Sequence, residues 1–498
     1  MGGTFNFPHP SLGIIRGLTS LSTQQFLGLR YAILASKWAP PLMSEGFING
    51  IVDATVQGIE IEFGHIQKAL PVPDIQKSDT ECLNLNITAP TDVSPGANLP
   101  VIVFLHGGGY GIGANSWPQY DFRRVVDLSV RGGQPVIGVN INYRLGAFGF
   151  LTSNELVSHG YKPNNGLHDQ RTALLWIKQH ISGFGGDPDN TTLVGESAGG
   201  VSATHHLESE IPLFKRMVSM SGTNLLMQPL PEQAMELTYQ AIIDRLGLAS
   251  IPASHGVSTL VNMDTRKLLQ AIRPSDPLLP IYRGTAGLLN LPGRKWCEEI
   301  MIGDCQTDAS ILSTMLTRDK NGIVSASRES LARSLGSAGK ADQVLDAYSI
   351  SQNTSDEEAF ISILGFANDI CFFLPVLHYG HCWSGHAFIY NFNEPNPWDG
   401  PWRGSANHIL DVAFLFQNYN ESLSQPQRAV AIQFAQDLIA FSNRRPPWLP
   451  FMWENNDLYS RVYGGKGANT SGKVVTVLRC SDRTARHYLE VDTEYPSG

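Results

Sequence analysis

The sequence predicts an α/β fold with a mostly parallel central sheet flanked by helices. Short apolar runs of strand length alternate with segments of helical period, which is typical of parallel strands joined by crossover helices. The chain has 498 residues, of which 42% are hydrophobic and 16% are charged, so it can bury a large core. No internal repeat, low-complexity linker or block of like charges divides it. We therefore expect a single domain over residues 1–498.

The strands are predicted from apolar or β-branched runs, and the helices from apolar residues that recur on one face. Two longer stretches, about 224–295 and 313–380, are helix-like and punctuated by Pro and Gly. Insertions of this kind usually cover a functional site and do not extend a sheet, so we expect both to roof the site. The predicted strands are 99–105, 136–142, 191–194, 216–220, 300–303, 386–392 and 473–478, and the clearest predicted helices are about 169–181 and 198–207.

Composition and charge argue against several kinds of partner. The net charge of −9 and the lack of a basic cluster argue against nucleic acid. No stretch approaches about 18 uninterrupted apolar residues, so no membrane span is expected. The N-terminus lacks the basic start and apolar core of a secretory signal, and the six cysteines form no C-x-x-C metal pair. We expect a cytoplasmic protein, and the oligomeric state has no signature in the sequence.

The pattern G-x-S-x-G at residues 195–199 indicates a nucleophilic serine, Ser197. Such a serine lies on a tight turn from strand to helix, where the flanking glycines let neighbouring backbone approach. Five residues of this kind also arise by chance in a Gly-rich chain, so the context matters. Here a β-branched strand precedes the motif and a helix-competent segment follows it, which favours the functional interpretation.

A second Gly-rich segment, His106–Gly109, follows the predicted strand 99–105. Acyl transfer needs hydrogen-bond donors directed at the oxyanion that develops on the attacked carbonyl. The backbone N–H groups of Gly108 and Gly109, with that of Ala198 after the serine, are predicted to form this oxyanion hole. The alternative is that the glycines form only a flexible turn.

The serine needs a histidine to accept its proton and an acid to orient that histidine. In folds with this serine turn the chain order is serine, acid, histidine. His408 is favoured because it follows small residues in a loop between a predicted strand and an apolar helical segment. Asp304 and Asp308 both lie in the loop after strand 300–303, and the pattern does not separate them. The competing histidines are His378, His381, His386 and His487.

Landmark segments along most of the chain resemble type B carboxylesterases, the group that includes cholinesterases and several fungal lipases and esterases. They include FLGLRYA at 26–32, ECLNLNI at 81–87, NYRLGAFGFL at 142–151, FGGDPDNTTLVGESAGG at 184–200 and SMSG at 219–222. In character the chain is closest to fungal intracellular carboxylesterases. The resemblance implies the α/β-hydrolase fold and a small-molecule ester substrate. It places the acid at Asp308 and the histidine at His408, with the oxyanion hole at the three positions named above.

The chain departs from that family at two positions. Most members have Glu as the acid, so the shorter Asp308 implies a loop that comes closer to His408. Secreted members pair the cysteine of the ECLNLN segment with an upstream cysteine, but none precedes Cys82, which is expected to be a free buried thiol in a reducing compartment.

The resemblance also assigns supporting roles to residues around the site. Ser221 is expected to hydrogen-bond the acid, and Arg144 with Asp169 to form a buried ion pair that braces the sheet. Glu196 either tunes the charge near the histidine or is simply a polar neighbour. His168 is expected to be structural.

The implied mechanism is two-step acyl transfer through an acyl-serine, without a metal or organic cofactor. Two alternatives stay open. The acyl group can pass to an alcohol, an amine or an internal nucleophile, giving a transferase, lactonase or cyclising enzyme of fungal secondary metabolism. The chain can also be a non-catalytic, cholinesterase-like recognition protein, which would be expected to have a broken triad and a membrane tether. Acyl and alcohol specificity are not readable, and aromatic residues of the insertions, among them Phe372, are expected mostly to be core.

Overall fold

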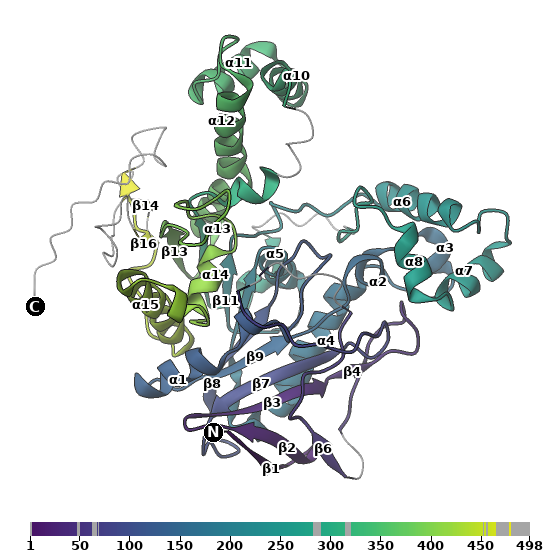
Figure 1. The fold of residues 1–498 in the computed structure, drawn as a ribbon, viewed down its shortest axis with the longest axis vertical. Helices are drawn as coiled ribbons and strands as arrows, with labels where there is room; N and C mark the ends of the chain where they lie inside the picture. Colours follow the sequence, from purple (N-terminus) through teal and green to yellow (C-terminus); the bar gives the residue numbers. More distant parts are fainter. Residues whose placement is uncertain are drawn as a thin grey trace, which may run out of the picture.

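A computed structural model describes residues 2–46, 50–61, 67, 69–281, 290–313, 320–451, 453–454, 457–464 and 478–479. A twelve-stranded sheet runs through this part of the molecule, with helices around it (Figure 1). The strand order is β1-β2-β3-β7-β9-β8-β10-β11-β12-β13-β16, and β6 pairs with β2. The strands are β1 Gly3–His9, β2 Gly13–Thr19, β3 Thr23–Arg30, β6 Ile51–Asp53, β7 Asn84–Pro90, β8 Leu99–Leu105, β9 Ile137–Ile141, β10 Gly186–Glu196, β11 Arg216–Met220, β12 Glu299–Cys305, β13 His386–Phe392 and β16 Arg461–Tyr463.

The sheet has an antiparallel part and a parallel part. From β1 to β9 the neighbours on the main path are antiparallel, whereas from β9 through β8 to β16 every pair is parallel. Parallel strands need crossover connections, and these are where the helices lie. The carboxyl ends of the parallel strands meet at one edge, where α/β folds place their sites.

Strand β8 shows why its sequence forms a buried strand. Alternate residues of a strand point to opposite faces of the sheet. Val101 and Val103 belong to one core cluster, while Ile102 and Phe104 belong to a second. Both faces are therefore covered, and a strand covered on both faces reads as a continuous apolar run.

The helices connect the strands and form two extensions. In Figure 1, α6, α7 and α8 make a lobe to one side, next to α3, while α10 and α11 lie at the outer end of α12, away from the sheet. The helices are α1 Arg123–Arg131, α2 Gly146–Phe150, α3 Asn154–Ser158, α4 Asn165–His180, α5 Ala198–His205, α6 Glu232–Arg245, α7 Ala253–Val261, α8 Thr265–Ala271, α10 Ile323–Leu335, α11 Ala338–Ala347, α12 Asp356–Asn368, α13 Leu374–Cys382, α14 Leu410–Leu415 and α15 Gln425–Ser442.

The predicted elements that lie within the described residues are recovered, some of them with shifted ends. The strands predicted at 99–105, 216–220 and 386–392 have the observed bounds, and β10 is longer than predicted and runs up to the serine turn. Strand 473–478 lies outside the described residues except for its last position, which belongs to the short strand β17 (Leu478–Arg479). The described edge of the large sheet is formed by β16 instead, which was not predicted.

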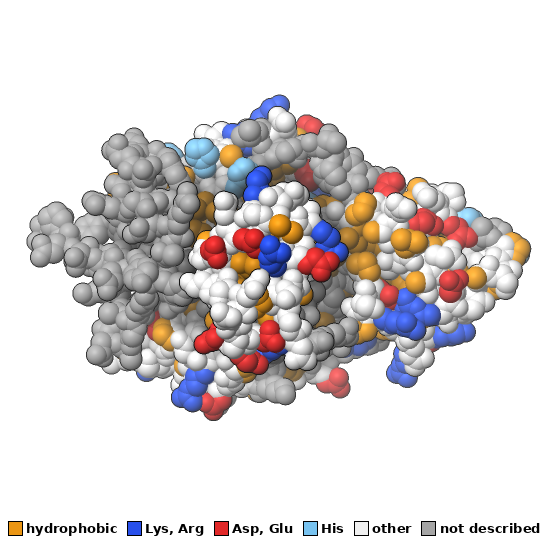
Figure 2. Space-filling view, turned by 90° about the horizontal axis from the view of Figure 1, so that it is seen from above, with side chains coloured by type: hydrophobic (Ala, Val, Ile, Leu, Met, Phe, Trp, Pro, Cys, Tyr) orange, Lys and Arg blue, Asp and Glu red, His pale blue; other side chains and the backbone are white. Residues whose placement is uncertain are grey.

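The stretch Asp356–Cys382 is one long helical segment formed by α12, a π-helical turn (Asp369–Phe373) and α13. It is the one stretch of the described residues whose length and composition would suffice to cross a membrane, with a mean hydropathy of 1.9 and about a third of that window buried. This stretch is therefore an exception to the expectation that no part of the chain could cross a membrane. Because α13 packs on β12 and β13, the stretch is part of the fold. Seen from above, acidic and basic side chains are intermixed over the outer end of this extension (Figure 2).

Two structural expectations from the sequence are confirmed. Arg144 and Asp169 are fully buried and form a bidentate ion pair, with N–O distances of 2.7 and 2.8 Å. Cys82 is a buried free thiol, and burial raises its pKa to about 12. His168 lies on α4, where burial lowers its pKa.

Candidate active site

Ser197 lies between the end of β10 and the start of α5, on a strained turn. Its φ of 52° and ψ of −123° define a backbone conformation that residues with a side chain rarely adopt. A Cβ on Gly195 would be 2.1 Å from the carbonyl oxygen of Gly199, and one on Gly199 would be 2.0 Å from that of Leu105. The Ser197 N–H donates to Met220 on the next strand at 2.8 Å. Neighbouring backbone therefore holds the serine in place.

His408 connects Ser197 to Asp308. Its Nε2 is 2.9 Å from the Ser197 Oγ, and its Nδ1 is 2.8 Å from the Asp308 Oδ1. Ser197 is 9% exposed, His408 is 5% exposed and Asp308 is fully buried. Hydrogen bonds of this kind let a histidine take the serine proton while the carboxylate holds the ring.

The structure separates the two candidate acids. The Asp308 carboxylate accepts a second hydrogen bond from the Cys305 N–H at 2.7 Å, and the N–H that follows Asp308 donates to the Asn368 amide at 2.9 Å. Asp304 instead lies on β12, and its carboxylate accepts from Asn391 at 2.7 Å. Only Asp308 of the two is hydrogen-bonded to His408.

The acid and histidine loops are hydrogen-bonded to each other. Thr307 donates its N–H to the Ala406 carbonyl at 2.8 Å, and the His408 N–H donates to the Ser310 hydroxyl at 3.1 Å. These bonds hold the two loops close together, so that the short Asp308 side chain reaches His408. Phe372, from the second insertion, has its ring centroid 5.6 Å from that of His408.

The charges around His408 favour its protonated form. Burial lowers its pKa, but the hydrogen bond and charge of Asp308, with the charges of Glu196 and Asp411, outweigh burial and raise the pKa to about 9. Glu196 is buried, and its Oε1 is 3.5 Å from the His408 Nε2. Burial raises the pKa of Glu196 to about 8; the charge of His408 opposes this rise, and the charges of Asp411 and Asp308 add to it. Neither Glu196 carboxylate oxygen makes a hydrogen bond within the described residues.

The Gly-rich loop runs directly beside the serine. A Cβ added to Gly107 would be 2.9 Å from the Ser197 Cβ, and Gly108 and Gly109 have φ values of 98° and 60°. The N–H groups of Gly108, Gly109 and Ala198 make no hydrogen bond to any described residue. Unused backbone donors beside a nucleophile are what an oxyanion hole requires.

One supporting contact differs from its expected geometry. The Ser221 hydroxyl donates to the Cys305 sulfur at 3.8 Å, and among the described residues it makes no hydrogen bond to Asp308. The expected direct bond to the acid is therefore corrected. The Asp308 carboxylate accepts from His408 and from the Cys305 N–H, and the Ser221 hydroxyl is directed at the Cys305 side chain instead.

The sequence reasoning did not identify Asp411, a fully buried acid on α14. It accepts hydrogen bonds from the Tyr390 hydroxyl and from the Val412 N–H, both at 2.8 Å. Burial raises its pKa to about 6, and the charge of Asp308 acts in the same direction. The available signal was a single acid three residues after His408 within an apolar helical run.

The fold and this arrangement define a serine hydrolase of the α/β-hydrolase class. The chain belongs to the carboxylesterase family, whose model matches residues 9–447, and it is a carboxylic ester hydrolase.

The relatives agree with the family assignment. The chain is 29% identical to the para-nitrobenzyl esterase of Bacillus subtilis over 420 residues, which cover 82% of each protein. It is 34% identical over 212 residues to an inactive carboxylesterase-like protein of Byssochlamys spectabilis, covering 41% of this chain and 36% of that one. A solved structure of a PNB esterase superposes with a TM-score of 0.73 at 23% identity, covering 95% of this chain and 96% of the other, which supports the fold.

Proposed function

We propose that Ser197, His408 and Asp308 hydrolyse carboxylic esters of small molecules through an acyl-serine. The Ser197 Oγ attacks the ester carbonyl while His408 Nε2 accepts its proton. The tetrahedral intermediate then expels the alkoxide, which leaves as an alcohol after taking that proton from His408. Water repeats the sequence on the acyl-enzyme and releases the acid. The continuous hydrogen bonds from Asp308 to Ser197 carry this proposal.

The N–H groups of Gly108, Gly109 and Ala198 are proposed to bind the oxyanion in both steps. They lack partners in the described structure, so they need no rearrangement before the charge forms. Loss of one such donor costs about two to three powers of ten in rate. Asp308 holds the His408 ring and stabilises the imidazolium that forms in each step.

The inactive relative from Byssochlamys spectabilis makes a non-catalytic role worth testing. In this chain the serine, histidine and acid lie within hydrogen-bond distance of one another, which favours catalysis. Hydrolysis and acyl transfer are separated by measuring how the acyl-enzyme partitions between water and an added alcohol. A transferase would give a transesterified product whose yield rises steeply with the alcohol concentration. We expect the free acid to remain the main product.

A reducing compartment is the proposed location. The structure describes five cysteines, all free, and three of them are buried (Cys82, Cys297 and Cys305). Burial raises the pKa of Cys297, which keeps that thiol protonated and unreactive. Alkylation of protein from its own cells under denaturing conditions, followed by mass spectrometry, is expected to find these thiols reduced. A disulfide at Cys82 would contradict the location.

The deciding experiment is Ser197→Ala. It is expected to lower kcat/KM for short p-nitrophenyl esters by about five to six powers of ten and to abolish labelling by a fluorophosphonate probe. Ser158→Ala, at an exposed serine, is the matched control and should leave both unchanged. Labelling that persists in Ser197→Ala, with the protein still folded by circular dichroism, would overturn the assignment.

A further inference from the structure

A polar patch lies on one face of the sheet and contains none of the residues assigned to catalysis. Gln25 on β3 is paired with Thr88 on β7, and Asn86 on β7 is paired with Asn140 on β9. Each of these side chains is 8% exposed or less. Burying polar groups is costly unless they are hydrogen-bonded, so a polar patch on a covered sheet face calls for a partner.

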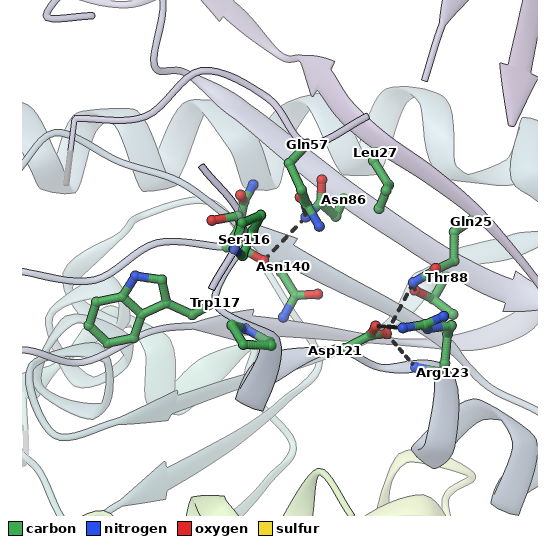
Figure 3. Close-up of a pocket in the computed structure, with 13 residues that line it drawn as sticks. Gln25, Leu27, Gln57, Asn86, Thr88, Ser116, Trp117, Asp121, Arg123 and Asn140 are labelled. Carbon is green, nitrogen blue, oxygen red and sulfur yellow. Dashed lines mark hydrogen bonds and ion pairs between the residues drawn. The ribbon is translucent and has the colours of Figure 1, made fainter. Parts of the chain in front are cut away.

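These four side chains line a cavity of about 220 Å³ (Figure 3). Residues 115–118, which follow the Gly-rich loop in the chain, and Gln57 also line the cavity. Leu27, Pro73 and Pro118 add apolar surface. None of the triad or proposed oxyanion residues lines it. The volume is below the roughly 300–1,000 Å³ typical of a site for a drug-sized ligand, so the cavity fits a smaller molecule.

Part of the hydrogen-bonding capacity of this wall serves the fold. The Asn86 oxygen accepts from the Gly28 N–H at 2.8 Å, and its nitrogen donates to Gln57 at 2.8 Å. The Asn140 nitrogen donates to the Tyr120 carbonyl at 3.0 Å. The Gln25 nitrogen donates to the Thr88 hydroxyl at 3.1 Å. These bonds fix the direction of the side chains before any ligand binds.

The remaining capacity is unused within the described part of the chain. The side-chain amide oxygens of Gln25, Asn140 and Asn115 accept no hydrogen bond there, and the side-chain nitrogen of Gln57 and the Thr88 hydroxyl donate none. Figure 3 shows Asn140 between the Asn86 side of the cavity and Asp121. The cavity therefore offers both acceptors and donors. A hydroxyl group, which donates and accepts, matches such a wall better than an anion or a cation does.

The charge of the cavity is balanced. Asp121 and Arg123 are the charged residues that line it, and they pair with each other at 2.6 Å. A charged ligand would find no unpaired counter-ion. We infer that this cavity binds a neutral, hydroxyl-rich small molecule no larger than a single hexose, with hydroxyls on the amides and C–H faces on Leu27 and the prolines.

The test uses the full chain carrying Ser197→Ala, so that acylation of the serine and turnover do not contribute. Saturation-transfer NMR and calorimetry with glycerol, myo-inositol and glucose are expected to show saturable one-to-one binding. Glucose 6-phosphate and cyclohexanol are expected to bind at least tenfold more weakly. Failure of the proposed esterase activity would leave this result untouched, because the inference does not depend on turnover.

Two substitutions locate the site. Gln25→Met and Thr88→Val keep the side-chain volume nearly constant while removing polar atoms, and each is expected to weaken binding at least tenfold. Gln24→Met is the matched control on the opposite face of the same strand, and it should bind like the parent. Binding of maltotetraose distinguishes a glycan end from a free small molecule as the ligand. An affinity equal to that for glucose supports a site for a glycan end, and a weaker affinity supports a site for a free small molecule. Absence of saturable binding of any neutral polyol, or binding unchanged in both folded cavity variants, would overturn the inference.

Discussion

The serine side and the acid–histidine side of the candidate site are held by different means. Ser197 is positioned by backbone packing, because glycines at 195 and 199 allow contacts that a Cβ would block. Asp308 and His408 are positioned by hydrogen bonds between loops that are 100 residues apart in the chain. One side is thus set by local steric fit and the other by a long-range polar network, so substitutions should affect the two sides differently.

The largest expected effect is on catalysis at the polar side. Asp308→Asn keeps the side-chain size but favours the wrong histidine tautomer, so kcat should fall by about four powers of ten while the fold remains. Steady-state kinetics with a p-nitrophenyl ester measure kcat, and a thermal melt shows whether the fold is retained. Asp304→Asn is the control and should keep most of the activity, because its carboxylate contacts Asn391. Equal losses in both variants would contradict the assignment of the acid.

A large effect on stability is expected at the steric side. Gly195→Ala places a Cβ 2.1 Å from the Gly199 carbonyl oxygen, and the protein should lose about 3 to 5 kcal/mol of unfolding free energy or fail to fold. Gly365→Ala is the control, since nothing lies within 4 Å of its added Cβ within α12, and it should gain up to about 1 kcal/mol. Urea unfolding measures both. A soluble Gly195→Ala protein of parental stability would show that the turn is not sterically held.

Glu196 joins the two sides, because it precedes the serine and faces His408. Its negative charge raises the pKa of His408, and the histidine must be neutral to act as a base. Glu196→Gln removes that charge, so the pKa of His408 should fall and the acidic limb of the kcat/KM profile should move to lower pH. Glu394→Gln, at another buried acid, is the control. A profile that does not move, or that moves to higher pH, would limit Glu196 to a plain polar role.

The smallest effect is expected at Ser221. Its hydroxyl reaches the Cys305 sulfur and not the acid, so Ser221→Ala should change kcat/KM less than about threefold and cost on the order of 1 kcal/mol of stability. Kinetics and urea unfolding test both values. A loss comparable to that of Asp308→Asn would instead support the direct bond to the acid that the family resemblance implied.

The parallel strands that carry the site were predictable, because strands covered on both faces leave continuous apolar runs. The bounds of β10 were not, since its polar residues 187–190 resemble a loop, and pairing with β8 is interrupted between Gly186 and Thr191. Asp411 was missed because a single acid in an apolar helix has no distinctive spacing. The polar patch of Gln25, Thr88, Asn86 and Asn140 was invisible for another reason: strand pairing alone brings these residues together.

The sequence by itself determined the serine, because the turn that presents it is built from five consecutive residues whose steric demands are local. It also indicated the Gly-rich loop and the likeness to a family. The residue pattern left Asp304 and Asp308 open and the family resemblance favoured Asp308, but only the tertiary structure shows which of the two contacts His408. It also directs Ser221 to a thiol and places Glu196 and Asp411 around the histidine. Those contacts depend on which loops of the sheet edge meet, and burial then sets the pKa of each group, neither of which is encoded in adjacent residues.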